Sequence, residues 1–234
     1  MGTPQSGRRS WALLLAAIGA GGLAFATTAA AVEVRGSLDV PKDLSDQAAD
    51  EPATHEPYWE EWNGVLDPKD PTFEPARELA VVLTGSGSAD PDGCEYALRG
   101  GDFAPRTIVA KGGSTLRIKN TDGCSHELHA DMEGFAPLQT APGNARTVTL
   151  PGEGHWVVRD KRYPHVEGHL HAVKDLVACG AIAADGKFTF ENVEPGTYTL
   201  AVYHDAEQVA SQQVEIEEGG TQTLEPIALS AKSD

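Results

Sequence analysis

Short stretches in which apolar and polar residues alternate run through most of the chain. The first covers residues 32–40, and its alternating side chains would point to opposite faces of a strand. We expect this strand to pair with residues 78–83. From residue 107 onward the pattern recurs between Gly, Pro, Asn and Asp, which predicts strands at residues 107–110, 115–119, 127–130, 146–150, 155–158 and 168–173. This spacing is typical of an antiparallel sandwich, and no stretch predicts a substantial helix.

A second group of strands follows residue 175. Residues 185–190 alternate directly after an Asp-Gly turn, and the Pro195-Gly196 turn opens another alternating run. The Gly219-Gly220 pair predicts a hairpin between two further strands, at residues 208–216 and 221–229. The chain is therefore predicted to be all-β, with one sandwich over residues 32–174 and a smaller one over residues 175–234.

The first 31 residues carry an export pattern. A basic start at Arg8-Arg9 precedes an apolar run over residues 11–25, and small residues up to Ala31 suit a signal peptidase. A retained membrane anchor is the alternative, but the run is shorter than the roughly 20 residues that a spanning helix needs. The Arg pair is also compatible with a twin-arginine signal. We expect residues 1–31 to be a signal peptide and the mature protein to be periplasmic or secreted, with no membrane contact.

Residues 41–77 form a long acidic insertion rich in proline, without helical or strand periodicity. Loops of this length inside a domain are uncommon and are either functional or disordered. An aromatic cluster lies within the insertion, at Tyr58, Trp59, Trp62 and Phe73. Two interpretations stay open: the rings cover one end of the sandwich, or Tyr58, Trp59 and Trp62 dock a carbohydrate or an envelope protein.

The net charge of the chain narrows the classes of partner. The formal net charge is -17, and removal of residues 1–31 takes away two Arg and no acid, which brings it to -19. Such a chain repels nucleic acid and anionic membranes.

Three Cys cannot all pair within one exported chain. We expect a Cys94–Cys124 bridge, because each follows Asp-Gly in a loop, and Cys179 as the unpaired residue, although the sequence does not establish this pairing.

The last 55 or so residues resemble the carboxypeptidase regulatory-like domain. The resemblance rests on the Asp-Gly-x-Phe motif at residues 185–188 and on Pro-Gly-x-Tyr-x-Leu at residues 195–200. It implies a small transthyretin-like or immunoglobulin-like sandwich. Such modules are usually structural or adhesive, so the resemblance implies architecture rather than catalysis.

Residues 103 to about 190 resemble an exported cupredoxin of the plastocyanin and methylamine-utilisation type. The motifs are Phe103-x-Pro105, Lys111-Gly112-Gly113, the loop Asn120-x-Asp122-x-x-x-His126 and the strands near residues 154–158 and 168–173. The resemblance implies a Greek-key sandwich. It also implies that His126 and His165 match the two copper-binding histidines.

Two ligands of that family are missing from this chain. The position of the copper-binding Cys falls near Arg162, and the axial Met falls near Val166 or Gly168. Because the thiolate makes a blue-copper centre, its loss argues against electron transfer of that kind.

Other histidines could complete a metal site. His169 and His171 alternate on one predicted strand and so share a face. With His126 and His165 they would suit copper or zinc, helped by His129 or Glu167, and a Cys124 thiolate is a further option. The alternative is metal-free, with His169 and His171 on the solvent face of an edge strand and His126 in the core.

These observations favour a non-catalytic binding protein over an enzyme. A cupin-like metalloenzyme would use His169, His171, Asp175 and His204, but the glycine and proline spacing of cupin motifs is missing. No Gly-x-Ser-x-Gly elbow or phosphate-binding loop is present. We therefore predict an exported protein with a histidine-based copper or zinc site, and as the alternative a metal-free structural or adhesive protein of the cell envelope.

Overall fold

The computed structural model describes residues 2, 31–42, 73–87 and 94–230. Within them the chain is all-β, as predicted, and α3 (Pro75–Glu78) is a single helical turn. No helix of the described residues is long and apolar enough to cross a membrane. The predicted signal peptide, apart from Gly2 and Ala31, lies outside the described residues, as do the aromatic side chains at positions 58, 59 and 62.

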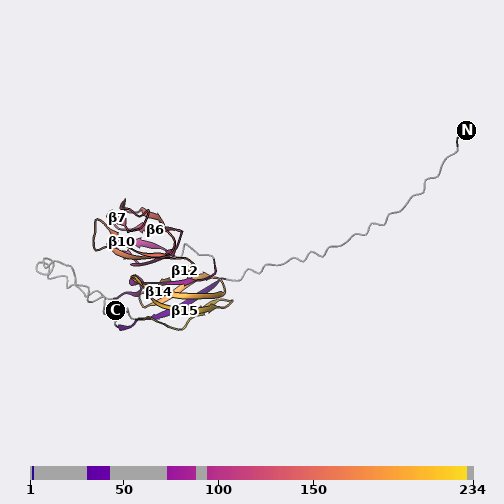
Figure 1. The fold of residues 1–234 in the computed structure, drawn as a ribbon. Coiled ribbons are helices and arrows are strands. Elements are labelled where there is room, and N and C mark those ends of the chain that lie inside the picture. The colour runs from indigo at the N-terminus through magenta and orange to yellow at the C-terminus, as the bar shows by residue number, and fades with distance from the viewer. Residues whose placement is uncertain (1, 3–30, 43–72, 88–93, 231–234) are drawn as a thin grey trace.

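Two sheets from the middle of the chain pack face to face. The first contains, in spatial order, β5 (Thr107–Lys111), β11 (Glu167–Val173), β10 (Gly154–Asp160), β7 (His126–His129) and β8 (Leu138–Thr140). The second contains β4 (Phe103–Ala104), β3 (Tyr96–Leu98), β6 (Thr115–Asn120) and β9 (Ala145–Thr149). Buried side chains from both sheets form one core, including Phe103, Ile118, Leu128 and Leu170. This unit is a sandwich built from residues 96–173, a part of the range predicted for the first sandwich (Figure 1).

The third sheet curls around a core of its own. Its strands are, in order, β15 (Glu207–Ile216), β14 (Gly196–His204), β2 (Leu79–Thr84), β12 (Leu176–Ile182), β13 (Lys187–Val193), β1 (Val32–Asp39) and β16 (Thr221–Thr223), with β17 (Ile227–Ala228) also paired to β1. Phe188, Phe190 and Leu200 are fully or almost fully buried in that core. Figure 1 shows this sheet beneath the sandwich, where β12, β14 and β15 are labelled.

The predicted pairing of the first strand with residues 78–83 is wrong. β1 pairs with β13, β16 and β17, whereas β2 lies between β12 and β14. A side chain at position 36 would place its Cβ 2.3 Å from the Phe188 ring, so Gly36 lets the neighbouring strand bring this ring over β1. Two strands from the predicted first domain therefore belong to the sheet of the C-terminal unit.

A disulfide and an apolar contact join the two units. Cys94, just before β3, is bonded to Cys179 of β12, and Cys124 is free and exposed. The expected Cys94–Cys124 bridge is wrong, because β2 and β12 pack beside β5 and bring position 179 against the sandwich. Ala80, Val82, Val109, Leu176 and Ala201 form the buried contact between the units.

The buried phenol of Tyr96 predicts a loss of stability at alkaline pH. Its hydroxyl donates to the Val109 carbonyl and accepts from the Val109 N–H at 2.9 Å. Burial raises the pKa of Tyr96 far above its ordinary value of 10.0. The unfolded chain releases this proton above a pH of about 10 and the folded chain keeps it, so stability falls as the pH rises past that value. Urea unfolding should show this slope, and a Tyr96→Phe variant with the same slope would contradict the assignment.

Candidate metal centre

His126 lies at the start of β7, on the face of the sheet that points into the sandwich core. It shares this face with Leu128, and its side chain is 1% exposed. The loop before it is held by Asn120, whose amide donates to the carbonyl oxygens of Cys124 and Thr140, each at 2.9 Å. The buried Asn120 thereby fixes the approach of the loop to the strand.

Three side chains surround the imidazole of His126. Nδ1 lies 2.6 Å from Oδ2 of Asp160, and Nε2 lies 3.1 Å from Oδ2 of Asp122. The Sγ atom of Cys124 lies 3.6 Å from the same Nε2. Two ionised carboxylates can both accept from this ring only when both of its nitrogens carry a proton. Cys124 Sγ and Asp122 Oδ2 thus lie at the Nε2 edge of the ring and Asp160 lies at the other edge, and Nε2 can act as a ligand atom once it has lost its proton.

Both carboxylates are held by the backbone. Asp160 Oδ1 accepts from the N–H groups of Glu127 at 3.2 Å and of Arg162 at 2.7 Å. Asp122 accepts from the N–H groups of Gly100 at 2.6 Å and Gly101 at 3.1 Å. Sequence reasoning missed Asp160, because nothing in an acidic chain distinguishes one carboxylate that is buried from many that are solvated.

Tyr163 covers the outer side of this cluster. Its ring centroid lies 5.3 Å from that of His126. A hydrogen bond between the Tyr163 and Cys124 side chains raises the pKa of the Tyr163 phenol. Cys124 therefore has the imidazole and the phenol as its polar neighbours.

His165 lies on the far side of Tyr163. It is exposed, and its ring centroid is 6.2 Å from the centroid of Tyr163. Its role as a metal ligand stays a prediction. Val166 and Gly168, the positions expected from the resemblance to match an axial methionine, lie in the core, since Val166 is fully buried and a Cβ at Gly168 would come within 2.8 Å of the Phe103 ring.

His169 and His171 share a face of β11, but it is the opposite face of the sheet from His126. Leu170, between them, points into the sandwich core, so the two histidines point toward the curled sheet. β11 lies between β5 and β10 and is not an edge strand, which corrects the metal-free expectation for these residues. His155 of β10 joins them, because it pairs directly with His171.

The four predicted ligands lie in different places: His126 is at the start of β7, His165 is in the turn between β10 and β11, and His169 and His171 face the curled sheet. The side chains around His126 form one group, and His155, His169 and His171 form another. Within the part of the chain that the structure describes, no group of three or more His, Cys, Asp or Glu side chains is placed so that it could hold a metal ion as it stands. Binding at either group would require side-chain rotation.

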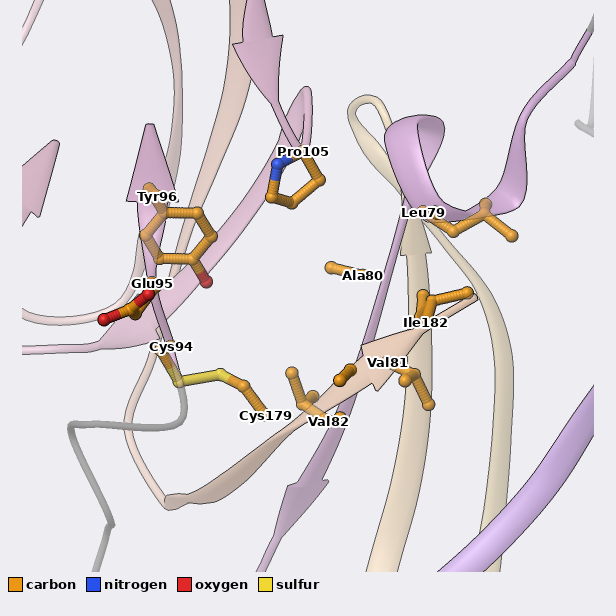
Figure 2. A pocket seen from close by; sticks show the side chains of 13 residues that line it. Leu79, Ala80, Val81, Val82, Cys94, Glu95, Tyr96, Pro105, Cys179 and Ile182 are labelled. Carbon is orange, nitrogen blue, oxygen red and sulfur yellow. A yellow bond between two sulfur atoms is a disulfide. The ribbon is translucent and has the colours of Figure 1, made fainter. Parts of the chain in front are cut away.

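Two cavities of the described residues have none of these side chains in their lining. One of about 330 Å³ lies between the two units, bounded by β2, β12 and the segment from Cys94 to Tyr96 (Figure 2). Its lining is mostly apolar, and the Tyr96 hydroxyl is engaged with Val109. Another hollow, of about 540 Å³, carries Arg99, Arg117 and Lys119.

Comparison with known proteins gives limited similarity. Residues 180–224 match the family model "Polysaccharide lyase family 4, domain II", well under half of the chain. No curated protein matches. Among solved structures, amicyanin from Paracoccus versutus is 14% identical with a TM-score of 0.33, over 40% of this chain and 97% of amicyanin. A copper-containing nitrite reductase from Thermus scotoductus is 20% identical with a TM-score of 0.31, over 44% of this chain and 27% of the reductase. The strand pairing, not these neighbours, defines the fold, and the regulatory-like type of the C-terminal unit stays a prediction.

Proposed function

We propose that this chain is an exported, non-catalytic binding protein that holds one copper or zinc ion at the loop before β7. Cys124 and His126 are the principal ligands and Asp122 is the third. The observation that carries the proposal is the convergence of Cys124 Sγ and Asp122 Oδ2 on the Nε2 atom of His126, at 3.6 and 3.1 Å.

These separations have the size that a metal site needs. An ion with bonds of about 2.3 Å to sulfur and about 2.0–2.2 Å to nitrogen and oxygen holds neighbouring donors roughly 3–3.6 Å apart. The contacts of His126 with Cys124 and Asp122 lie in this range. On binding, the ion would replace the direct contact of Nε2 with Asp122, and the loop side chains would turn toward it.

The surroundings of His126 favour Nε2 as the ligand atom. A metal-bound histidine usually donates its other N–H to a carboxylate or carbonyl, which fixes the ring and makes it a better ligand. In this chain the carboxylate is that of Asp160, whose Oδ2 lies 2.6 Å from Nδ1 of His126. Asp122 is likewise held by the N–H groups of Gly100 and Gly101.

The donor set and the charge of the chain narrow the kind of ion. A thiolate, an imidazole and a carboxylate suit zinc or copper better than magnesium or calcium, which prefer oxygen ligands. The net charge of -17 favours the approach of a cation. Binding would release protons from the thiol and the imidazole, so affinity should fall as the pH falls.

The test is metal binding by the full chain and by variants at this cluster. We expect Cys124→Ser and His126→Gln each to weaken binding by about 100-fold or more, because each removes a direct ligand and loss of an outer partner alone costs about 10–100-fold. Cobalt(II) is a suitable probe, since a thiolate-to-cobalt absorption band should appear with the unaltered chain and vanish with Cys124→Ser.

His129→Gln is the matched control, because His129 lies on the same strand but on its other face. It should leave both the affinity and the thiolate band unchanged. An unaltered chain that shows no thiolate band with cobalt(II) or copper(II) would refute this site. If it also took up no metal elsewhere, the structural or adhesive role in the cell envelope would be preferred.

A further inference from the structure

Three histidines lie together on the outer face of the sandwich, on two paired strands. His169 and His171 are two residues apart on β11, and His155 of β10 is directly opposite His171 in the register. A histidine pair at i and i+2 on one strand, with a third histidine on the neighbouring strand, puts three imidazoles on one side of a rigid sheet. The local backbone therefore brings three nitrogen ligands together without a loop.

Two of these rings contact each other directly. His155 Nε2 and His169 Nδ1 are 3.1 Å apart and share a hydrogen bond, with the two rings at 8° to each other, and a bound ion would replace this bond. Metal–nitrogen bonds of about 2.0–2.1 Å at angles near 90–110° place two nitrogens roughly 2.9–3.4 Å apart. The third ring is adjacent, since the centroids of His155 and His171 are 4.7 Å apart.

The tautomer of His171 is set by the other unit. Its Nε2–H donates to the carbonyl oxygen of Asp205 at 2.6 Å, which leaves Nδ1 as the nitrogen with a free lone pair. Asp205 follows β14, and its own N–H donates to Thr107 Oγ1 of the sandwich at 3.0 Å. His171 is 7% exposed. The C-terminal unit thus positions this ring.

Acidic groups stand at the opposite edge of His169. Its Nε2 lies 3.9 Å from Glu167 Oε1 and 3.9 Å from Asp205 Oδ1. A ring that binds a metal through Nδ1 and turns its Nε2–H toward carboxylates has the usual arrangement of a metal-bound histidine. Burial also lowers the pKa of His171 to about 4 and lowers that of His155.

We propose that His155, His169 and His171 hold a second metal ion, zinc or copper(II), separate from the ion at Cys124 and His126. Three imidazoles leave the fourth position open to water or to a small anion. Because Asp205 belongs to the C-terminal unit, binding also stabilises the contact of that unit with the sandwich. This inference does not rest on the proposed function.

The test uses the full chain carrying Cys124→Ser and His126→Gln, so that the other cluster cannot contribute. In this background we expect one equivalent of zinc, measured by competition with a chromophoric chelator. His155→Gln and His169→Gln should each weaken binding by about 100-fold or more, since each removes a direct ligand. With copper(II), electron paramagnetic resonance should show hyperfine coupling to several nitrogens.

His129→Gln in the same background is the control, and it should bind zinc as tightly as its parent. Both test positions are accessible, since His155 is exposed and the His169 side chain is 19% exposed, and thermal unfolding without metal would verify that the variants fold. Equal zinc affinity in His155→Gln, His169→Gln and His129→Gln would overturn the proposal. A copper spectrum with coupling to a single nitrogen would also overturn it.

Discussion

Replacing Asp160 with Ala is expected to lower the free energy of unfolding by about 3–5 kcal/mol. The side chain of Asp160 is fully buried and accepts hydrogen bonds from His126 Nδ1 and from the N–H groups of Glu127 and Arg162. Its removal leaves the buried Nδ1–H of His126 and two part-buried N–H groups without this partner, and the desolvation of the buried donor is then uncompensated. Urea unfolding of the metal-free protein would measure the loss.

Asp131→Ala is the matched control for this substitution, because Asp131 is an exposed aspartate in the turn after β7. Exposed changes of this kind usually alter stability by no more than about 0.5 kcal/mol. Asp160→Asn should cost less than Asp160→Ala, since its amide oxygen can still accept from the backbone. If Asp160→Ala and Asp131→Ala unfolded at the same urea concentration, the buried network would contribute nothing.

Removal of the Cys94–Cys179 disulfide is expected to destabilise the protein by about 4 kcal/mol. The bond joins residues 85 positions apart, and it links the sandwich to the curled sheet. A crosslink over so long a segment restricts the unfolded chain strongly, which raises the free energy of the unfolded state. Thermal unfolding of the Cys94→Ser/Cys179→Ser double variant, compared with the unaltered chain, would measure this.

Cys124→Ser is the control, since Cys124 is exposed and unpaired, and without metal it should unfold like the unaltered chain. A reducing agent should lower the unfolding temperature of the unaltered chain and leave the double variant unchanged. Under non-reducing conditions, a proteolytic fragment linking positions 94 and 179 should be found. A fragment linking 94 to 124 would contradict the observed pairing.

The positions of most strands were predictable because the alternation of apolar and polar residues is local. The predicted strands at residues 115–119 and 168–173 correspond closely to β6 and β11. Short strands such as β3, β4 and β8 were missed, since two or three residues carry no recognisable period. The sharing of one face by His169 and His171 was predictable for the same local reason, and it is confirmed.

The sequence by itself determined that the chain is all-β, where most strands run and which residues alternate, because each depends on near neighbours. Only the tertiary structure decided that β1 and β2 join the C-terminal sheet, that Cys94 bonds to Cys179, and that His126 and His171 lie on opposite faces of one sheet. These depend on contacts between residues far apart in the chain. An alternating strand can bury its apolar face in either of two cores, and the choice follows from packing such as that of Gly36 against Phe188.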